Sequence, residues 1–182
     1  AKTAGNFARE LQLLLRYLGA SEANMEKGQM RVEVNVSISK DKNELGTKVE
    51  VKNINSFRAV EKAIEYEIKR QTSLIEKGES WKQQTRGWDD NKGETVMQRE
   101  KETAADYRYF PEPDLPPITV NQEHINQVAA EMPALPGVLF ERYTKEFGLS
   151  EYDAYNITDQ KGIALYYEAL ISICPNYKAA AN

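Results

Sequence analysis

Two different spacings of apolar residues alternate along the chain, and they predict most of its secondary structure. From Ala8 to Leu18 apolar residues recur three and four positions apart, which predicts a helix that ends at Gly19. From Met30 to Ile38, and again from Lys48 to Lys52, apolar and polar residues alternate. This alternation predicts two strands of a β-hairpin with one apolar face and one charged face.

A second helix and a second hairpin are expected next. Asn55 or Ser56 can cap a helix that ends at Gly78, and such a helix would pack on the apolar face of the first hairpin. The segment 81–101 predicts another hairpin, with Asp90, Asn91 and Gly93 in its turn. Its expected buried residues are Trp81, Trp88, Val96 and Met97. The fold class is therefore expected to be α+β, with an antiparallel sheet that forms a cradle with packed helices.

A proline-rich segment, Asp106–Pro117, is expected to follow an extended path, because proline disfavours helix and strand pairing. Beyond it the spacing of apolar residues is helical again. The expected helices are 122–131, 136–147, 151–156 and 159–173, the last capped by Thr158. Five tyrosines are most simply expected to pack this part, although such amphipathic rings also serve at interfaces: Tyr143, Tyr152, Tyr155, Tyr166 and Tyr167. We therefore expect residues 1–118 to belong to the cradle domain and residues 119–182 to form a small helical domain.

The composition is that of an ordinary globular protein and indicates no particular partner. Hydrophobic residues make up 41% of the chain, charged residues 29%, and the formal net charge is -4. A single cysteine, Cys174, excludes an intrachain disulfide framework. No apolar run approaches the roughly 18 residues needed to cross a bilayer. We expect no membrane partner and a cytoplasmic location, or an organellar one if the source is eukaryotic.

The charged face of the first hairpin is the strongest candidate for chemistry. Alternation places six polar side chains on it: Arg31, Glu33, Asn35, Lys48, Glu50 and Lys52. A register that pairs Arg31 with Lys52 would place Glu33 opposite Glu50, and facing carboxylates destabilise a sheet unless something neutralises them. Bound Mg²⁺ with nucleotide phosphates is one interpretation. Neutralisation by the neighbouring lysines on a solvated face is the other.

The other groups of residues that could carry chemistry give weaker evidence for a functional site. The two glycine-rich phosphate-binding motifs, GxxxxGK[ST] and GxGxxG, are both absent. The sequence also has no cysteines and histidines at the spacing of zinc ligands. The only histidine, His124, lies in a polar helical segment far from Cys174, which favours a surface role over a nucleophilic site. The aromatic and basic cluster at residues 107–110 favours packing on the sheet over base stacking.

Four stretches together resemble a known family. They are MEKGQMRVEVNVS, LGTKVEVKNINSFRAVEKAIEYEIKRQ, QTRGWDD and DYRYFPEPDLPP, in this order and spacing. They resemble the B subunits of the aspartyl/glutamyl-tRNA(Asn/Gln) amidotransferases, the GatB family, over almost the whole chain. The resemblance implies a central fragment, with the family's N-terminal part before Ala1 and its C-terminal tail domain after Asn182.

The resemblance also implies an activity and its partners. B subunits of this family act with an amidase subunit and a small third subunit on mischarged Glu-tRNA(Gln) or Asp-tRNA(Asn). They use ATP with Mg²⁺ to phosphorylate the side-chain carboxylate of the attached amino acid, and ammonia arriving through a channel then displaces the phosphate. An acyl phosphate supplies the leaving group that a carboxylate lacks. The sequence does not indicate which tRNA is preferred.

By the same resemblance, the metal-binding carboxylates fall on Glu33 and Glu50. The family commonly has aspartate at the first position, so the glutamate here reaches one methylene further. Contacts to nucleotide or acyl substrate are inferred for four residues: Asn35, Lys48, Lys52 and Arg58. Three more, Arg86, Arg99 and Lys101, are expected to shape the cradle around the site.

Two expectations follow for this chain taken by itself. Because the family's other metal ligands would precede Ala1, we expect weak or no ATP hydrolysis, and the acidic net charge predicts weak tRNA binding. The alternative function is a noncatalytic module, for subunit docking or tRNA binding, whose polar hairpin face is an interaction surface.

Overall fold

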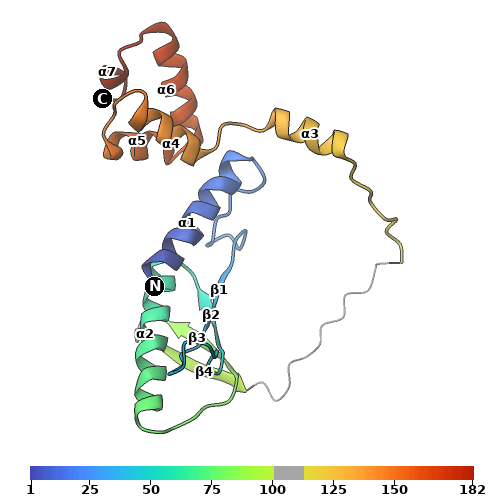
Figure 1. Cartoon of the computed structure of the whole chain (residues 1–182), viewed down its shortest axis with the longest axis vertical. Coiled ribbons are helices and arrows are strands. Elements are labelled where there is room, and N and C mark those ends of the chain that lie inside the picture. Colours follow the sequence, from blue (N-terminus) through green and yellow to red (C-terminus); the bar gives the residue numbers. More distant parts are fainter. Residues whose placement is uncertain (101–112) are drawn as a thin grey trace. The chain divides into compact units, whose positions relative to one another are not determined.

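The structure, a computed structural model, describes residues 1–100 and 113–182, which belong to two compact units. Helix α1 (Lys2–Tyr17) contributes to both, with its first residues in unit 1 and its later residues in unit 2. Among the described residues, unit 1 contains the strands and unit 2 is helical (Figure 1). The α+β class is thereby confirmed. The boundary expected after residue 118 stays a prediction.

Unit 1 is built on a four-stranded sheet in the order β1-β2-β3-β4. Its strands are β1 (Val32–Val36), β2 (Val49–Ile54), β3 (Gln84–Asp89) and β4 (Glu94–Glu100). Both predicted hairpins are confirmed, because β1 pairs antiparallel with β2 and β3 pairs antiparallel with β4. Strands β2 and β3, however, pair in parallel. The sheet is mixed, and the expectation of a purely antiparallel sheet was wrong.

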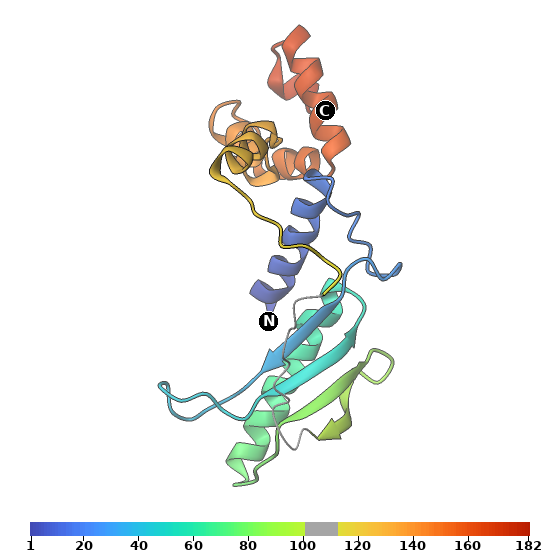
Figure 2. The ribbon, with the colours of Figure 1, turned by 90° about the vertical axis from the view of Figure 1, so that its right-hand side faces the viewer.

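Helix α2 (Phe57–Glu76) explains the parallel pairing. A parallel pair needs a long crossover connection, and α2 supplies it between β2 and β3. The helix begins where expected, because the Ser56 side chain accepts a hydrogen bond from the Ala59 amide at 3.1 Å. It lies along one face of the sheet (Figures 1 and 2).

The core of unit 1 lies between α2 and the sheet. Its buried residues are Val49, Val51, Ile54, Ala59, Val60, Ala63 and Trp88. Trp88 is thus buried as predicted, and Trp81 packs at the edge of the core. Val96 and Met97 are 44% and 53% exposed, so their predicted burial was wrong. Both lie on β4, which pairs with β3 and ends the described sheet order.

Unit 2 is a helical cluster. Its helices after α1 are α3 (Gln122–Glu131), α4 (Pro136–Lys145), α5 (Glu151–Thr158), α6 (Lys161–Ile173) and the short α7 (Tyr177–Ala180). The first four agree with the prediction to within a few residues, whereas α7 was not predicted. Thr158 does not cap α6: it ends α5, and its hydroxyl donates to the Ala154 carbonyl at 2.8 Å.

Only some of the tyrosines pack unit 2. Tyr143 and Tyr167 are buried and contact each other edge to face, with ring centroids 5.0 Å apart. Tyr152, Tyr155 and Tyr166 are exposed, so their predicted burial was wrong. The core of unit 2 instead includes Tyr17 at the end of α1, whose hydroxyl donates a hydrogen bond to the Thr158 carbonyl at 2.8 Å.

Part of the predicted proline-rich segment, residues 106–112, lies outside the described residues, as do Lys101 and the aromatic and basic cluster at 107–110. Within the described ranges, no helix is both long and apolar enough to cross a bilayer.

Candidate functional site

One face of the sheet in unit 1 carries the polar side chains of the first hairpin. Val49 and Val51 point toward α2 and are fully buried, so the alternation along β2 directs Glu50 and Lys52 to the opposite side. No described helix of this unit covers that side (Figure 2). We call it the carboxylate face and define it by five residues: Glu33, Asn35, Glu50, Lys52 and Thr85.

The strand register differs from the one considered above. Asn35 pairs with Glu50, and a bulge interrupts the ladder between Val32 and Val34. Glu33 therefore does not lie directly opposite Glu50. From Val34 to Val36 the shift is two residues, which preserves the face of these side chains, because side chains alternate with a period of two. Across the bulge, where Val32 pairs with Ile54, the shift is three residues. The loop between the strands, residues 37–48, is too long to fix the register from sequence.

Both carboxylates contact the Lys52 ammonium. The Lys52 ammonium lies 3.2 Å from a Glu33 carboxylate oxygen and 3.8 Å from a Glu50 oxygen. Thr85, on the parallel neighbour β3, donates its hydroxyl to the other Glu50 oxygen at 3.1 Å. Glu50 is the more enclosed of the two, with its side chain 16% exposed against 43% for Glu33. The sheet thus places both carboxylates within 4 Å of the Lys52 ammonium.

This arrangement fits the chemistry of a hard divalent cation. Mg²⁺ takes oxygen ligands, and one or two carboxylates completed by water and phosphate oxygens are its usual protein site. In the described part of the chain, no group of three or more His, Cys, Asp and Glu side chains could hold a metal ion. Of the five residues that define the carboxylate face, Glu33 and Glu50 are the two with carboxylates.

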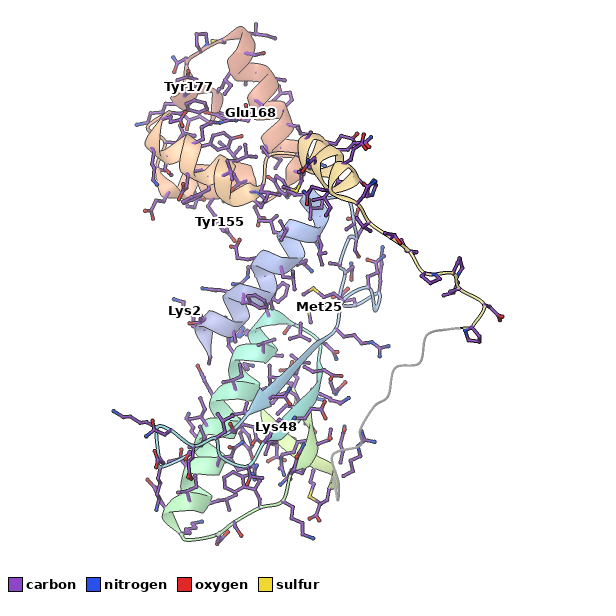
Figure 3. The ribbon with its side chains drawn as sticks, turned by 45° about the vertical axis from the view of Figure 1, so that its right-hand side comes forward. Lys2, Met25, Lys48, Tyr155, Glu168 and Tyr177 are labelled. Carbon is purple, nitrogen blue, oxygen red and sulfur yellow. The ribbon has the colours of Figure 1, made fainter. Side chains whose placement is uncertain are left out.

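The other residues predicted for the site are only partly brought together. Asn35 lies beside Glu50 on the neighbouring strand, and Lys52 lies between the carboxylates. Lys48 is exposed and directly precedes β2, so it lies toward the opposite end of the β1–β2 pair from Met25 (Figure 3). Arg58 is exposed in the first turn of α2, and its side chain has no hydrogen bond or ion pair with a described residue. Among the described residues, no contact links Arg58 to the carboxylate face.

A buried polar network on the other side of the sheet holds these strands in place. Glu67 of α2 is fully buried and receives hydrogen bonds from Arg70, Gln71 and Thr95 at 2.9, 2.9 and 2.5 Å. Arg86, on β3 next to Thr85, forms an ion pair with Glu67 at 3.2 Å. Arg86 was predicted to shape the cradle around the site; the structure shows that it links β3 to α2 through Glu67, and the predicted role stays a prediction. Arg99, predicted for the same role, lies on β4 and pairs with Thr85.

The Glu67 network also reaches β1 through Gln71. The same network stabilises the charged form of the Glu67 carboxyl group. Gln71 donates to the Val36 carbonyl at 3.3 Å and accepts from the Ile38 amide at 3.1 Å. Burial by itself would raise the pKa of Glu67, but hydrogen bonds from Arg70, Thr95 and Gln71 outweigh it and hold that pKa below its ordinary value. Burial and the nearby Arg70 lower the pKa of Arg86.

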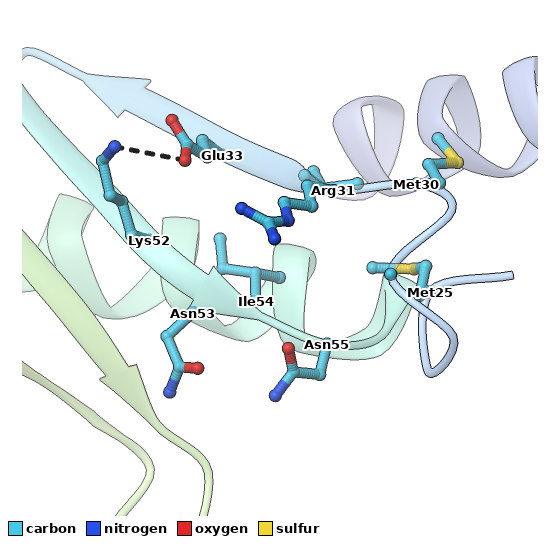
Figure 4. A pocket seen from close by; sticks show the side chains of 10 residues that line it. Met25, Met30, Arg31, Glu33, Lys52, Asn53, Ile54 and Asn55 are labelled. Carbon is cyan, nitrogen blue, oxygen red and sulfur yellow. Dashed lines mark ion pairs between the residues drawn. The ribbon is translucent and has the colours of Figure 1, made fainter. Parts of the chain in front are cut away.

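Three features in or next to the carboxylate face were not predicted from the sequence: Thr85, the Glu67 network, and a pocket beside Glu33. The pocket has a volume of about 350 Å³ and lies where β1 begins and β2 ends (Figure 4). Thr85 could not be assigned because the β2–β3 pairing was not foreseen. One signal for the network was available, since glutamate and glutamine at positions 67 and 71 face the same side of a helix.

Comparison with known proteins gives a consistent result. Residues 1–126 match the family model described as the GatB/GatE catalytic domain. The chain is 51% identical over 180 residues to the B subunit of the aspartyl/glutamyl-tRNA(Asn/Gln) amidotransferase of Gloeothece citriformis, covering 98% of this chain and 36% of that protein. It is 49% identical over 177 residues to the B subunit of the same enzyme from Caldicellulosiruptor saccharolyticus, covering 97% and 37%. The chain thus spans little more than a third of the length of these relatives.

Proposed function

Because the chain belongs to the GatB/GatE catalytic domain family, we propose that it is the part of a tRNA-dependent amidotransferase subunit that activates a carboxylate with ATP. The substrate would be the side-chain carboxylate of glutamate or aspartate on mischarged tRNA. The observation that carries this proposal is the pair Glu33 and Glu50, both in contact with Lys52 on a sheet face that no described helix of unit 1 covers.

The proposed reaction has two steps. A carboxylate oxygen of the aminoacyl group forms a bond to the terminal phosphorus of ATP, and the bond from that phosphorus to ADP breaks. Ammonia then attacks the acyl carbon of the resulting acyl phosphate, inorganic phosphate leaves, and the proton lost by nitrogen goes to solvent. The product is the amide of the side chain, as in Gln-tRNA or Asn-tRNA.

The residues of the carboxylate face have distinct roles in this scheme. Glu33 and Glu50 would hold Mg²⁺, which offsets phosphate charge during the transfer. Lys52 would give up part of its contact with the carboxylates and bind a phosphate oxygen, as an ammonium with three donors can. Asn35 would donate its amide to a phosphate or acyl oxygen. Thr85 would fix the rotamer of Glu50 through the hydrogen bond that it already makes.

The partners in this proposal come from what is known of the family. An amidase subunit would release ammonia from glutamine, a small third subunit would complete the enzyme, and mischarged tRNA would bind to the assembled complex. The relatives' own name as a subunit of an aspartyl/glutamyl-tRNA(Asn/Gln) amidotransferase supports such an assembly.

The direct test replaces each carboxylate by its neutral isostere in the full-length subunit of the reconstituted amidotransferase. We expect Glu33→Gln and Glu50→Gln to lower ATP-dependent amidation of mischarged tRNA by at least about 100-fold, because both remove a metal ligand. Glu44→Gln is the matched control, since Glu44 is exposed in the loop between the same strands. Turnover that is unchanged in both site variants would refute the assignment.

The same variants separate catalysis from docking. If the face is instead a noncatalytic interaction surface, nucleotide binding by the complex stays intact in both variants, and assembly or tRNA affinity changes. If the face is the catalytic site, Mg²⁺-dependent nucleotide binding is lost while the complex still assembles. Isothermal titration with ATP, together with gel filtration of the complex, measures both quantities.

A further inference from the structure

Another pocket lies within unit 2, and the proposed function does not use it. All of its lining residues belong to that unit, whereas the carboxylate face belongs to unit 1. The lining comes from the end of α1, from the segment between α3 and α4, and from α4 and α6. The pocket volume of about 200 Å³ is smaller than the roughly 300–1,000 Å³ of sites for drug-sized ligands. The pocket therefore suits a group no larger than one or two side chains.

The most buried part of the lining is apolar. Tyr17, Leu139 and Ala164 line the pocket and are 2%, 5% and 1% exposed. The Tyr17 hydroxyl already donates to the Thr158 carbonyl at 2.8 Å, so the polar end of this side chain is satisfied within the fold. A ligand group that contacts these three residues would gain mainly from the removal of apolar surface from water.

The charged side chains of the lining leave one positive charge unmatched. Arg142 and Glu168 form an ion pair, and each side chain is about one-third exposed (Figure 3 labels Glu168). Lys161 donates to the carbonyl of Tyr17, the last residue of α1, at 2.7 Å. Among the described residues, no carboxylate forms an ion pair with Lys161. An ammonium has three donors, so the contact with α1 leaves Lys161 able to bind an anion.

We propose that this pocket binds a carboxylate carried on a branched apolar group about as large as a leucine side chain. The apolar group would contact Tyr17, Leu139 and Ala164, and the carboxylate would accept a charge-assisted hydrogen bond from Lys161. One negative charge on the ligand matches the one unmatched positive charge of the lining. The C-terminal residue of a polypeptide and a free branched-chain acid both carry this chemistry.

The leucine methyl groups provide the test. In the 182-residue chain labelled with ¹³C at these groups, Leu139 and Leu165 report on the pocket, whereas Leu45 and Leu74 belong to unit 1. The probes are isocaproate, its neutral amide, and N-acetyl-leucine as a mimic of a polypeptide C-terminus. We expect isocaproate to shift the Leu139 and Leu165 signals in a saturable manner and to leave the Leu45 and Leu74 signals unchanged. Its dissociation constant should be about 1 mM, as expected for a ligand of about eight non-hydrogen atoms.

The acid and its amide test the charge in the parent chain, and a variant assigns the effect to Lys161. The amide should bind at least about fivefold more weakly than isocaproate, because it cannot form a charge-assisted hydrogen bond. Lys161→Gln should weaken isocaproate by a similar factor and change the affinity of the amide by less than about twofold. Lys178→Gln is the matched control, since Lys178 is exposed on α7 in the same unit and does not line the pocket.

A second variant tests the apolar part of the pocket. Ala134 lines the pocket and is exposed, so Ala134→Phe can place a ring in the space without overpacking the core. It should abolish the binding of isocaproate and of the amide alike. Ala129→Phe adds the same ring on the exposed surface of α3, outside the lining, and should leave both affinities unchanged.

The three probes distinguish the two sources of the ligand. If N-acetyl-leucine binds at least as tightly as isocaproate and does so through Lys161, the site accepts a polypeptide C-terminus. If isocaproate binds and N-acetyl-leucine does not, the ligand is a free acid. If no probe shifts Leu139 and Leu165, or if the amide binds as tightly as the acid, the inference is wrong. Neither result bears on the proposed function, which is tested through Glu33 and Glu50.

Discussion

At the scale of single residues, Glu67 makes the clearest energetic prediction. It is a fully buried carboxylate that Arg70 and Arg86 neutralise, and removing one member of a buried charge cluster leaves the others uncompensated. We expect Glu67→Gln to lower the free energy of unfolding of unit 1 by about 3 kcal/mol. Glu65→Gln, on the exposed surface of the same helix, should change it by less than about 0.5 kcal/mol. Urea unfolding followed by tryptophan fluorescence compares the two, since Trp81 and Trp88 both belong to unit 1.

The same residue predicts a pH dependence with a definite sign. Because the pKa of Glu67 is lower in the folded chain, its contribution to stability is fully present above the unfolded pKa of about 4.5 and is lost as the pH falls through the folded value. We expect the parent chain to lose stability below about pH 4.5, and the Glu67→Gln variant to lose less over the same interval. Urea midpoints measured from pH 7 to pH 3 test this. Parallel curves for the two proteins would contradict it.

At the scale of secondary-structure elements, the start of α2 determines where the crossover begins. Ser56 is extended, and its hydroxyl oxygen satisfies the Ala59 amide at the first turn. Ser56→Ala should cost about 1 kcal/mol of stability, and Ser56→Asp should retain most of the parent value, because aspartate caps equally well. Equal stabilities of the alanine variant and the parent chain in urea would show that the cap contributes nothing.

Elements with local signals could be predicted, and their long-range pairing could not. The Ser56 cap, the alternation in 30–38 and the helical spacing around α4 and α6 depend on neighbours in sequence. The parallel pairing of β2 with β3 depends on how α2 folds back, which no local pattern encodes. For the site, alternation placed Glu33, Glu50 and Lys52 on one face. It could not supply Thr85, which reaches Glu50 only through that pairing.

At the scale of the whole molecule, the chain combines a helix-backed sheet with a helical unit and spans little more than a third of its relatives' length. In the described part of the chain no group of three or more His, Cys, Asp and Glu side chains could hold a metal ion, so the proposed Mg²⁺ would have only Glu33 and Glu50 as ligands from it. A Mg²⁺ ion bound by two carboxylates depends on water and nucleotide for its other ligands, so positioning for phosphoryl transfer would be incomplete.

This incompleteness predicts how the chain behaves alone. We expect the purified 182-residue chain to hydrolyse ATP at least about 100-fold more slowly than the assembled amidotransferase, since misplaced phosphoryl groups lose most of the catalytic advantage of positioning. With a net charge of -4 it should also bind tRNA weakly, and the remaining affinity should fall further as salt rises. Phosphate release assays and filter binding at two salt concentrations measure these quantities, with the Glu50→Gln chain as the background control. ATP hydrolysis by the parent chain at the rate of the complex, abolished by Glu50→Gln, would mean that the two carboxylates and their neighbours already form a complete catalytic site.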